Sequence, residues 1–230
     1  MKIVDLILKI KRKWMKMRLQ PIRVYCLHHV CAELDPESMN ACDWMQIDEF
    51  KAKVKAMQQD GVAFISLSDA YFHIGDDKIR CEKSAVLTFD DGYASLKEIL
   101  PWLNEQQIPC TLFINGKYLD GKSYRHNPKE KYLTKEELWA LTSPLIEIGH
   151  HGWEHNRVSE MTKVEFEKSV ESNVSQLKEH PNYVPFWAYT YGEHTEASDK
   201  YLRAQSIVSV YIDGVKNYND ANVIHRELLS

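Results

Sequence analysis

The sequence predicts an α/β protein whose parallel strands form a barrel-like sheet. After Pro21, short β-rich segments alternate with longer helical patterns, as expected when crossover helices join parallel strands. Seven segments have the composition of strands, and 230 residues are enough for one domain of this class. We therefore expect one domain over residues 21–230, preceded by a distinct N-terminal segment.

The expected strands lie near Ile22–Leu27, Val62–Ser66, Ala85–Thr88, Cys110–Ile114, Ile146–Gly149, Val184–Ala188 and Ile207–Val210. The expected helices between them are Asp48–Gln59, Ser95–Gln106 and Thr162–Glu179. The last helix begins with a Thr-x-x-Glu capping box formed by Thr162 and Glu165. Segments in which Gly, Asn and charged residues gather are expected to be loops, at Ala32–Trp44, Gly75–Cys81, Asp120–Tyr132 and Tyr211–Ala221.

The composition argues against several classes of protein. A net charge of −4 and a pI near 6.2 give no basic surface of the kind that nucleic-acid-binding domains carry, so we expect no nucleic-acid partner. No segment approaches the roughly 20 apolar residues that span a bilayer. The five cysteines are odd in number and contain no Cys-x-x-Cys pair, which favours reduced thiols and a cytoplasmic location.

Residues 1–20 have the pattern of a basic amphipathic helix. Eight Lys or Arg residues lie between Met1 and Val24, against the single acid Asp5. Apolar residues recur there at steps of three and four, and basic residues interrupt any continuous apolar run, so a secretory signal peptide is not expected. Such a helix could hold the protein at the inner, anionic face of a membrane, or pack on its own domain or a second subunit.

Two adjacent acids follow an apolar strand segment. Asp90 and Asp91 precede Gly92, so both carboxylates are expected at the carboxyl end of a strand, where α/β folds build their sites. One acid could bind a cation while its neighbour accepts a proton. A solvated Asp-Asp-Gly turn would produce the same pattern.

Two histidines follow the later strand Ile146–Gly149. His151 and His155 are four residues apart, a spacing that brings two imidazoles to one side of a helical turn. Two imidazoles and one carboxylate form a ligand set that leaves positions on a metal ion open for water and substrate. The spacing alone is weak, because ten histidines in one chain produce such pairs by chance, and a structural histidine pair is the alternative.

An aromatic-rich turn ends the strand Val184–Ala188. Trp187 and Tyr189 carry rings that could stack on a sugar. Backbone N–H groups near Tyr191 and Gly192 could stabilise a developing oxyanion. Aromatic core residues at the end of a strand are an equally good interpretation.

Taken together and in this order, the three segments resemble the motifs of the polysaccharide deacetylase family, whose members share the NodB homology domain of carbohydrate esterase family 4. Thr88–Gly92 matches the first motif, residues 147–155 match the second, and Phe186–Gly192 is similar to the third. Residues 27–30, Leu-His-His-Val, look like the Tyr-His-x-Val segment near the start of many members. The resemblance covers the chain from Pro21 to the C-terminus.

The resemblance implies a distorted (β/α) barrel and a divalent metal, most often Zn²⁺, bound by Asp91, His151 and His155. Co²⁺, Ni²⁺ or Mn²⁺ would also suit such a ligand set. The resemblance further implies Asp90 as the general base that takes a proton from the activated water, and the Tyr191 N–H as a donor to the oxyanion.

The sequence departs from the family pattern at the residues that would orient the base and supply the acid. Ala188 stands where many members carry an Arg that orients the base, and Thr190 replaces a Pro. The late Leu-x-His motif, the source of the usual acid, is not evident. His225 is the nearest substitute and His194 the next. These departures bear on catalytic rate more than on metal binding.

The expected function is that of a metal-dependent hydrolase that removes N-acetyl groups from amino sugars in a polysaccharide or glycan intermediate. One alternative is a deformylase or deacetylase of a lipid-linked sugar, which would give the basic N-terminal helix a purpose. The other is a catalytically weak glycan-binding module derived from the family. The sequence leaves the sugar and the oligomeric state open.

Overall fold

The computed structural model describes residues 21–34, 44–74, 83–120, 131–215, 217 and 223–229. The basic amphipathic helix expected over residues 1–20 lies outside the described residues, as does much of the four segments expected to be loops. The described cysteines, Cys26, Cys31 and Cys110, are buried free thiols. No helix in the described part of the chain is both long and apolar enough to cross a bilayer.

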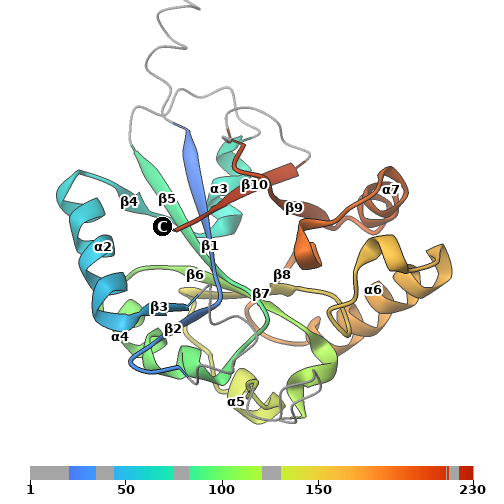
Figure 1. The fold of residues 1–230 in the computed structure, drawn as a ribbon, viewed down its shortest axis with the longest axis horizontal. Helices are drawn as coiled ribbons and strands as arrows, with labels where there is room; N and C mark the ends of the chain where they lie inside the picture. Colours follow the sequence, from blue (N-terminus) through green and yellow to red (C-terminus); the bar gives the residue numbers. More distant parts are fainter. Residues whose placement is uncertain are drawn as a thin grey trace, which may run out of the picture.

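Seven parallel strands close into a barrel, in the order β1-β5-β6-β7-β8-β9-β10 and back to β1 (Figure 1). They are β1 (Ile22–Leu27), β5 (Ser84–Phe89), β6 (Cys110–Ile114), β7 (Ile146–His150), β8 (Tyr183–Ala188), β9 (Val208–Ile212) and β10 (Val223–Leu228). Strands of a closed parallel barrel are buried on both faces, which explains their nearly continuous apolar composition. The predicted barrel of about seven parallel strands is confirmed.

The membership of the barrel differs from the prediction at one strand. The segment expected over residues 62–66 contributes only β4 (Ala63–Phe64), which pairs with the start of β5 and is not part of the closed ring. The ring is closed by β10 instead. No strand is predicted there, because the charged residues of its Val-Ile-His-Arg-Glu-Leu sequence obscure the apolar pattern.

Helices pack around the barrel, and the helix Leu67–Ile74 lies against its apolar interior through Leu67, Ala70 and Ile74 (Figure 1). They are α2 (Ile47–Gln59), α3 (Leu67–Ile74), α4 (Leu100–Glu105), α5 (Lys135–Trp139), α6 (Lys163–Leu177) and α7 (Glu196–Ala204). The capping box predicted for α6 is confirmed, since the Thr162 hydroxyl accepts from the Glu165 N–H and the Glu165 carboxylate accepts from the Thr162 N–H.

The helix expected over Ser95–Gln106 is divided into a 3-10 segment, η2 (Ala94–Glu98), and α4. Pro101 lies in the first turn of α4, where its missing N–H costs least, and it cannot continue a helix from the preceding turn. The remaining short segments are η3 (Gly116–Leu119), η4 (Val158–Glu160), η5 (Thr190–Gly192) and the parallel pair β2 (His29–Cys31) and β3 (Trp44–Gln46).

The interior of the barrel is largely apolar, apart from a buried pair, Thr111 and Glu147, and it becomes polar at its carboxyl end. Its apolar core consists largely of Ile22, Val24, Val86, Phe113, Phe186, Ala188, Val210 and Ile224. Because side chains alternate along a strand, Arg226 shares the inward face of β10 with Ile224, whereas His225 lies on the opposite face. β10 therefore directs a cation, and not an imidazole, toward the end of the barrel where the site lies.

Candidate metal centre and active site

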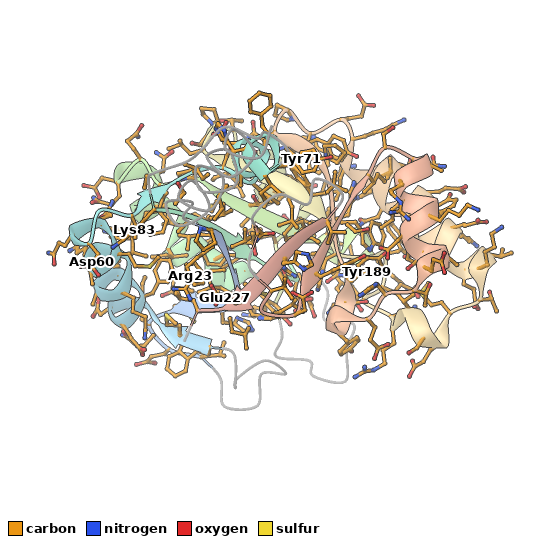
Figure 2. All side chains as sticks on the ribbon, turned by 90° about the horizontal axis from the view of Figure 1, so that it is seen from above. Arg23, Asp60, Tyr71, Lys83, Tyr189 and Glu227 are labelled. Carbon is orange, nitrogen blue, oxygen red and sulfur yellow. The ribbon has the colours of Figure 1, made fainter. Side chains whose placement is uncertain are left out.

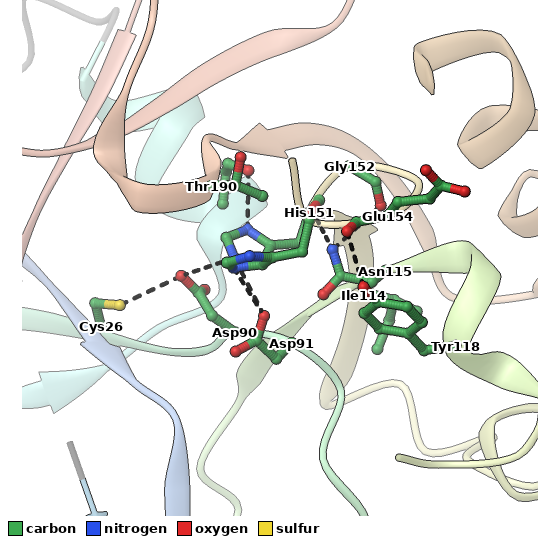
Figure 3. Close-up of polar contacts among 12 residues, drawn as sticks. Cys26, Asp90, Asp91, Ile114, Asn115, Tyr118, His151, Gly152, Glu154 and Thr190 are labelled. Carbon is green, nitrogen blue, oxygen red and sulfur yellow. Dashed lines mark hydrogen bonds and ion pairs between the residues drawn. The ribbon is translucent and has the colours of Figure 1, made fainter. Parts of the chain in front are cut away.

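The three expected metal ligands come together at the carboxyl end of the barrel. Figure 3 shows two of them, Asp91 and His151, facing each other. Asp91 follows β5, and His151 and His155 follow β7. Asp91 Oδ1 lies 3.1 Å from His155 Nε2 and 3.5 Å from His151 Nε2. All three side chains are buried, and one ligand atom of each lies within 4.8 Å of the others.

The tautomer of His151 fits this donor set to a divalent cation. Its Nδ1 lies 2.9 Å from the Ala188 carbonyl, so Nδ1–H donates there and the Nε2 lone pair is directed at Asp91. Burial lowers the pKa of His151 and favours the neutral ring. A lone pair and a carboxylate repel each other at 3.5 Å unless they share a cation. Two imidazoles and a carboxylate with open positions suit zinc.

The end of β6 holds the loop that carries the two histidines. The Asn115 side-chain amide donates to the His151 carbonyl, and the His151 N–H donates to the Ile114 carbonyl at 3.0 Å. The Tyr118 hydroxyl donates to the Glu154 carbonyl at 2.8 Å. The sequence analysis does not name Asn115 as a site residue. Its position directly after a buried strand could have indicated it, because such positions form the sites of α/β folds.

The backbone is left-handed at three residues of the site. Among the described residues, five non-glycine residues have positive φ, and three of these are Asp91 (φ 70°), His155 (φ 55°) and Tyr191 (φ 57°). Such backbone costs about 1–3 kcal/mol per residue and persists only where the surrounding structure imposes it. The loops of the site are therefore held in one conformation by their contacts.

Tyr191 forms the exposed rim of the site. Tyr191 is 49% exposed. Its ring lies edge-on to the His155 ring, with 4.6 Å between the ring centres, and the Arg157 guanidinium lies 3.9 Å from the centre of the Tyr191 ring. Gly192 follows with φ 68°, and an added Cβ would lie 2.8 Å from Ile212. The chain can make this close turn beside the metal ligands because residue 192 has no side chain.

As a correction to the sequence-based expectation, Trp187 and Tyr189 are core residues. They are 2% and 1% exposed. The Trp187 ring packs on His150 and Phe166, and the Tyr189 hydroxyl donates to Asp199 at 2.9 Å. These two rings therefore do not lie at a surface that a sugar could reach.

Asp90 is held by a residue from the last strand. Arg226 Nη1 lies 2.6 Å from Asp90 Oδ1 and Nη2 lies 2.9 Å from Oδ2, a fork that engages both oxygens. Burial alone would raise the pKa of Asp90, but the charge and hydrogen bonds of Arg226 bring it down to about 2, so the carboxylate is ionised. Its Oδ2 lies 3.8 Å from His151 Nε2 (Figure 3).

The sequence does not indicate Arg226 as a site residue. It lies 136 positions from Asp90, in a strand that the apolar pattern does not reveal. The only hint in the sequence is that residue 188 is Ala where many family members have Arg. The positive charge that pairs with Asp90 must then come from another part of the chain.

His28 also lies beside Asp90. The Asp90 N–H donates to the Leu27 carbonyl at 2.9 Å, which brings the residue after β1 next to the residue after β5. One ring nitrogen of His28, the Cys26 thiol and an Asp90 oxygen lie within 4.8 Å of one another. The resemblance of residues 27–30 to a family segment was the sequence signal for His28.

Cys26, His28 and Asp90 could geometrically form a second metal-binding group, but their charges oppose it. Both Asp90 oxygens already accept from the Arg226 cation, which would repel a metal ion. Burial raises the pKa of the Cys26 thiol well above its usual value, so the protonated form donates to Asp90. This group therefore serves Asp90 and is not a metal centre.

The structure does not bring His225 to the site. Its Nδ1 lies 2.8 Å from Asp213 Oδ2, and its ring meets Tyr211 edge-on, on the outward face of β10. The His194 ring stacks on the same Tyr211 ring, with 3.9 Å between the ring centres. The two histidines that the sequence suggested as acids thus lie together, apart from the metal ligands.

These features define a class of protein: a closed parallel (β/α) barrel that carries, at the carboxyl ends of its strands, two histidines and an aspartate that could hold a metal ion. The family model described as polysaccharide deacetylase matches residues 77–209, more than half of the chain. The chain belongs to the polysaccharide deacetylase family.

Solved structures share the fold of this chain. IcaB from Ammonifex degensii has a TM-score of 0.76 at 22% identity, over 93% of this chain and 94% of that one. A de-N-acetylase from Aggregatibacter actinomycetemcomitans has a TM-score of 0.71 at 18% identity, over 92% and 95%. At such identities the likeness establishes the fold.

Among curated proteins, YxkH of Bacillus subtilis (strain 168), a polysaccharide deacetylase by name, is 27% identical over 115 residues. The match spans 50% of this chain and 38% of that relative, so the chain accounts for well under half of the relative's length.

Proposed function

We propose that the chain is a metal-dependent hydrolase that removes N-acetyl groups from amino sugars of a polysaccharide or glycan intermediate. The observation that carries this proposal is an ionised, buried carboxylate, Asp90, placed 3.8 Å from His151 of the metal-ligand set. Membership in the polysaccharide deacetylase family supports an N-acetylated sugar as the substrate. The fold shared with a de-N-acetylase agrees with it.

Different residues of the site would perform different steps of the reaction. Asp91, His151 and His155 would hold the metal, for which Zn²⁺ is the first choice and Co²⁺, Ni²⁺ or Mn²⁺ are alternatives. A bound divalent ion would polarise the acyl carbonyl and lower the pKa of water. Asp90 accepts the proton from the attacking water. The Tyr191 N–H donates to the developing oxyanion.

Cleavage of the C–N bond releases an amine that needs a proton, and we assign its donation to His28. His28 lies next to Asp90 at the carboxyl end of β1, whereas His225 lies on the outward face of β10, bonded to Asp213. A general acid must come within hydrogen-bond reach of the leaving group, directly or through one water. His28 therefore takes the place first expected for His225.

The test of this proposal is acetate release by metal-stripped protein before and after addition of Zn²⁺ or Co²⁺. The substrates are N-acetylglucosamine oligomers and lipid-linked N-acetylated amino sugars, each with an N-formyl counterpart. Acetate release that requires the metal and is absent in Asp91→Asn supports the proposal. Release of formate alone favours a deformylase, and no release from any compound by metal-loaded protein rejects hydrolysis in favour of a glycan-binding module.

We also propose that the protein works in the cytoplasm, at the inner face of the membrane, through the basic segment 1–20. The support is the excess of Lys and Arg in this segment, which would favour anionic lipids. Full-length protein should sediment with anionic liposomes, and protein lacking residues 1–19 should not. Full-length protein that stays in the supernatant would rule out membrane contact.

A further inference from the structure

A base that takes a proton from water beside a metal ion must not bind the metal itself. Asp90 directly precedes the ligand Asp91, and its Oδ2 is only 3.8 Å from His151 Nε2. A carboxylate this close to a cation could rotate and become a fourth protein ligand, which would occupy a position needed by water or substrate. Something in the fold must therefore fix the orientation of Asp90.

We propose that Arg226 is the positioning residue that holds Asp90 as a base and keeps it out of the metal's coordination shell. This inference rests on the proposed function, because it gives Arg226 a part in the same reaction. The planar guanidinium fork meets both carboxylate oxygens, at 2.6 Å and 2.9 Å, and so fixes the plane of the carboxylate as well as its place.

Arg226 is itself held rigidly. It is 1% exposed, and its Nη1 donates a further hydrogen bond to Thr88 Oγ1 at 3.0 Å. The Thr88 hydroxyl donates in turn to the Tyr25 carbonyl at 2.8 Å, and the guanidinium lies 5.2 Å from the centre of the Phe113 ring. A guanidinium held by both Thr88 and the Phe113 ring can impose a fixed orientation on the carboxylate that it binds.

The strand that carries Arg226 also provides a matched control. Arg23 on β1 and Glu227 on β10 form another two-point pair, with Nε at 2.7 Å from Oε1 and Nη2 at 3.1 Å from Oε2 (Figure 2). This pair is partly exposed on the outside of the barrel. Arg23→Lys therefore removes a fork of the same kind between strands of the same ring, without touching Asp90.

The experiment compares Arg226→Lys, Arg23→Lys and wild type, each loaded with Co²⁺. Lysine keeps the positive charge but cannot grip both oxygens. Arg226→Lys should bind one metal per chain, show a changed visible absorption spectrum of Co²⁺, and lose roughly 10²-fold in kcat with little change in KM. Adding Asp90→Asn to Arg226→Lys should restore the wild-type cobalt spectrum. Arg23→Lys should match wild type throughout.

A second variant covers the case in which Arg226→Lys does not fold. Arg226→Ala, purified in the presence of guanidinium ion at a non-denaturing concentration, should recover part of its kcat when guanidinium is added and lose it when the ion is removed.

The outcomes separate this inference from the proposed function. The positioning role would be overturned if Arg226→Lys had the cobalt spectrum and the kcat of wild type. It would also be overturned if guanidinium did not change the kcat of folded Arg226→Ala. If wild type hydrolyses none of the substrates, the proposed function fails, while the cobalt spectra still decide whether Arg226 keeps Asp90 off the metal.

Discussion

The residues proposed to bind a metal, here the metal half of the site, and those proposed to transfer protons, the proton-transfer half, come from different parts of the chain. Asp91, His151 and His155 belong to two short motifs, each directly after one strand. Asp90 depends instead on Arg226 from the last strand, and His28 from the end of the first strand lies beside it. The proton-transfer half therefore exists only once β10 pairs with β1 and closes the barrel.

This difference predicts different failures for the two halves. Damage to the metal half should remove the ion and all chemistry with it. Damage to the proton-transfer half should leave a metal-loaded protein that turns over slowly. Substitutions that separate metal content from kcat therefore test whether the division is real.

The largest effect is expected for His151→Gln, in the metal half. Loss of one of three ligands should abolish stable metal binding and lower kcat/KM by roughly 10³-fold or more, because the ion supplies several kcal/mol of transition-state stabilisation. Metal content by mass spectrometry and acetate release measure the result. The neighbouring His150, which points to Tyr183 and not to the metal ligands, is the control: His150→Gln should retain the ion.

Asp90→Asn should separate the halves most clearly. The amide keeps the shape of the side chain but cannot act as a base, so kcat should fall by roughly 10²–10⁴-fold while one metal ion per chain remains bound. Loss of the metal in Asp90→Asn would show that Asp90 is a ligand and would merge the two halves.

His28→Gln should lower kcat by about 10²-fold with the metal retained, because a general acid contributes on this scale. His225→Gln is its matched control and should leave kcat near the wild-type value. The reverse pattern, a slow His225→Gln and a normal His28→Gln, would return the role of acid to His225.

The smallest effect is expected for Asn115→Ala, which removes the hydrogen bond to the His151 carbonyl. Supporting residues of this kind change metal affinity by roughly 10–100-fold, so the apparent metal dissociation constant should rise while kcat at saturating metal stays close to wild type. Asn104→Ala, on the outer helix α4, serves as the control and should leave metal affinity unchanged. Equal affinities in both variants would show that the histidine loop needs no support from β6.

Much of the architecture follows from local pattern. Short apolar segments separated by helical periodicity predict six of the seven strands of the ring, and the Thr162 capping box predicts the start of α6. The seventh strand is not predicted, because β10 carries an inward arginine where a barrel core normally has an apolar side chain. The ion pair with Asp90, which only the closed barrel forms, makes that arginine acceptable inside.

The sequence by itself determined the barrel class, and it placed the acidic pair after one strand and the histidine pair after another. The candidate metal ligands could be named from these motifs because each motif is a few residues long and directly follows its strand. Only the tertiary structure decided that Trp187 and Tyr189 are buried, that His225 points outward, and that Arg226 grips Asp90. Contacts between residues more than a hundred positions apart depend on which strands become neighbours and on which face each side chain takes, and neither is encoded in local spacing.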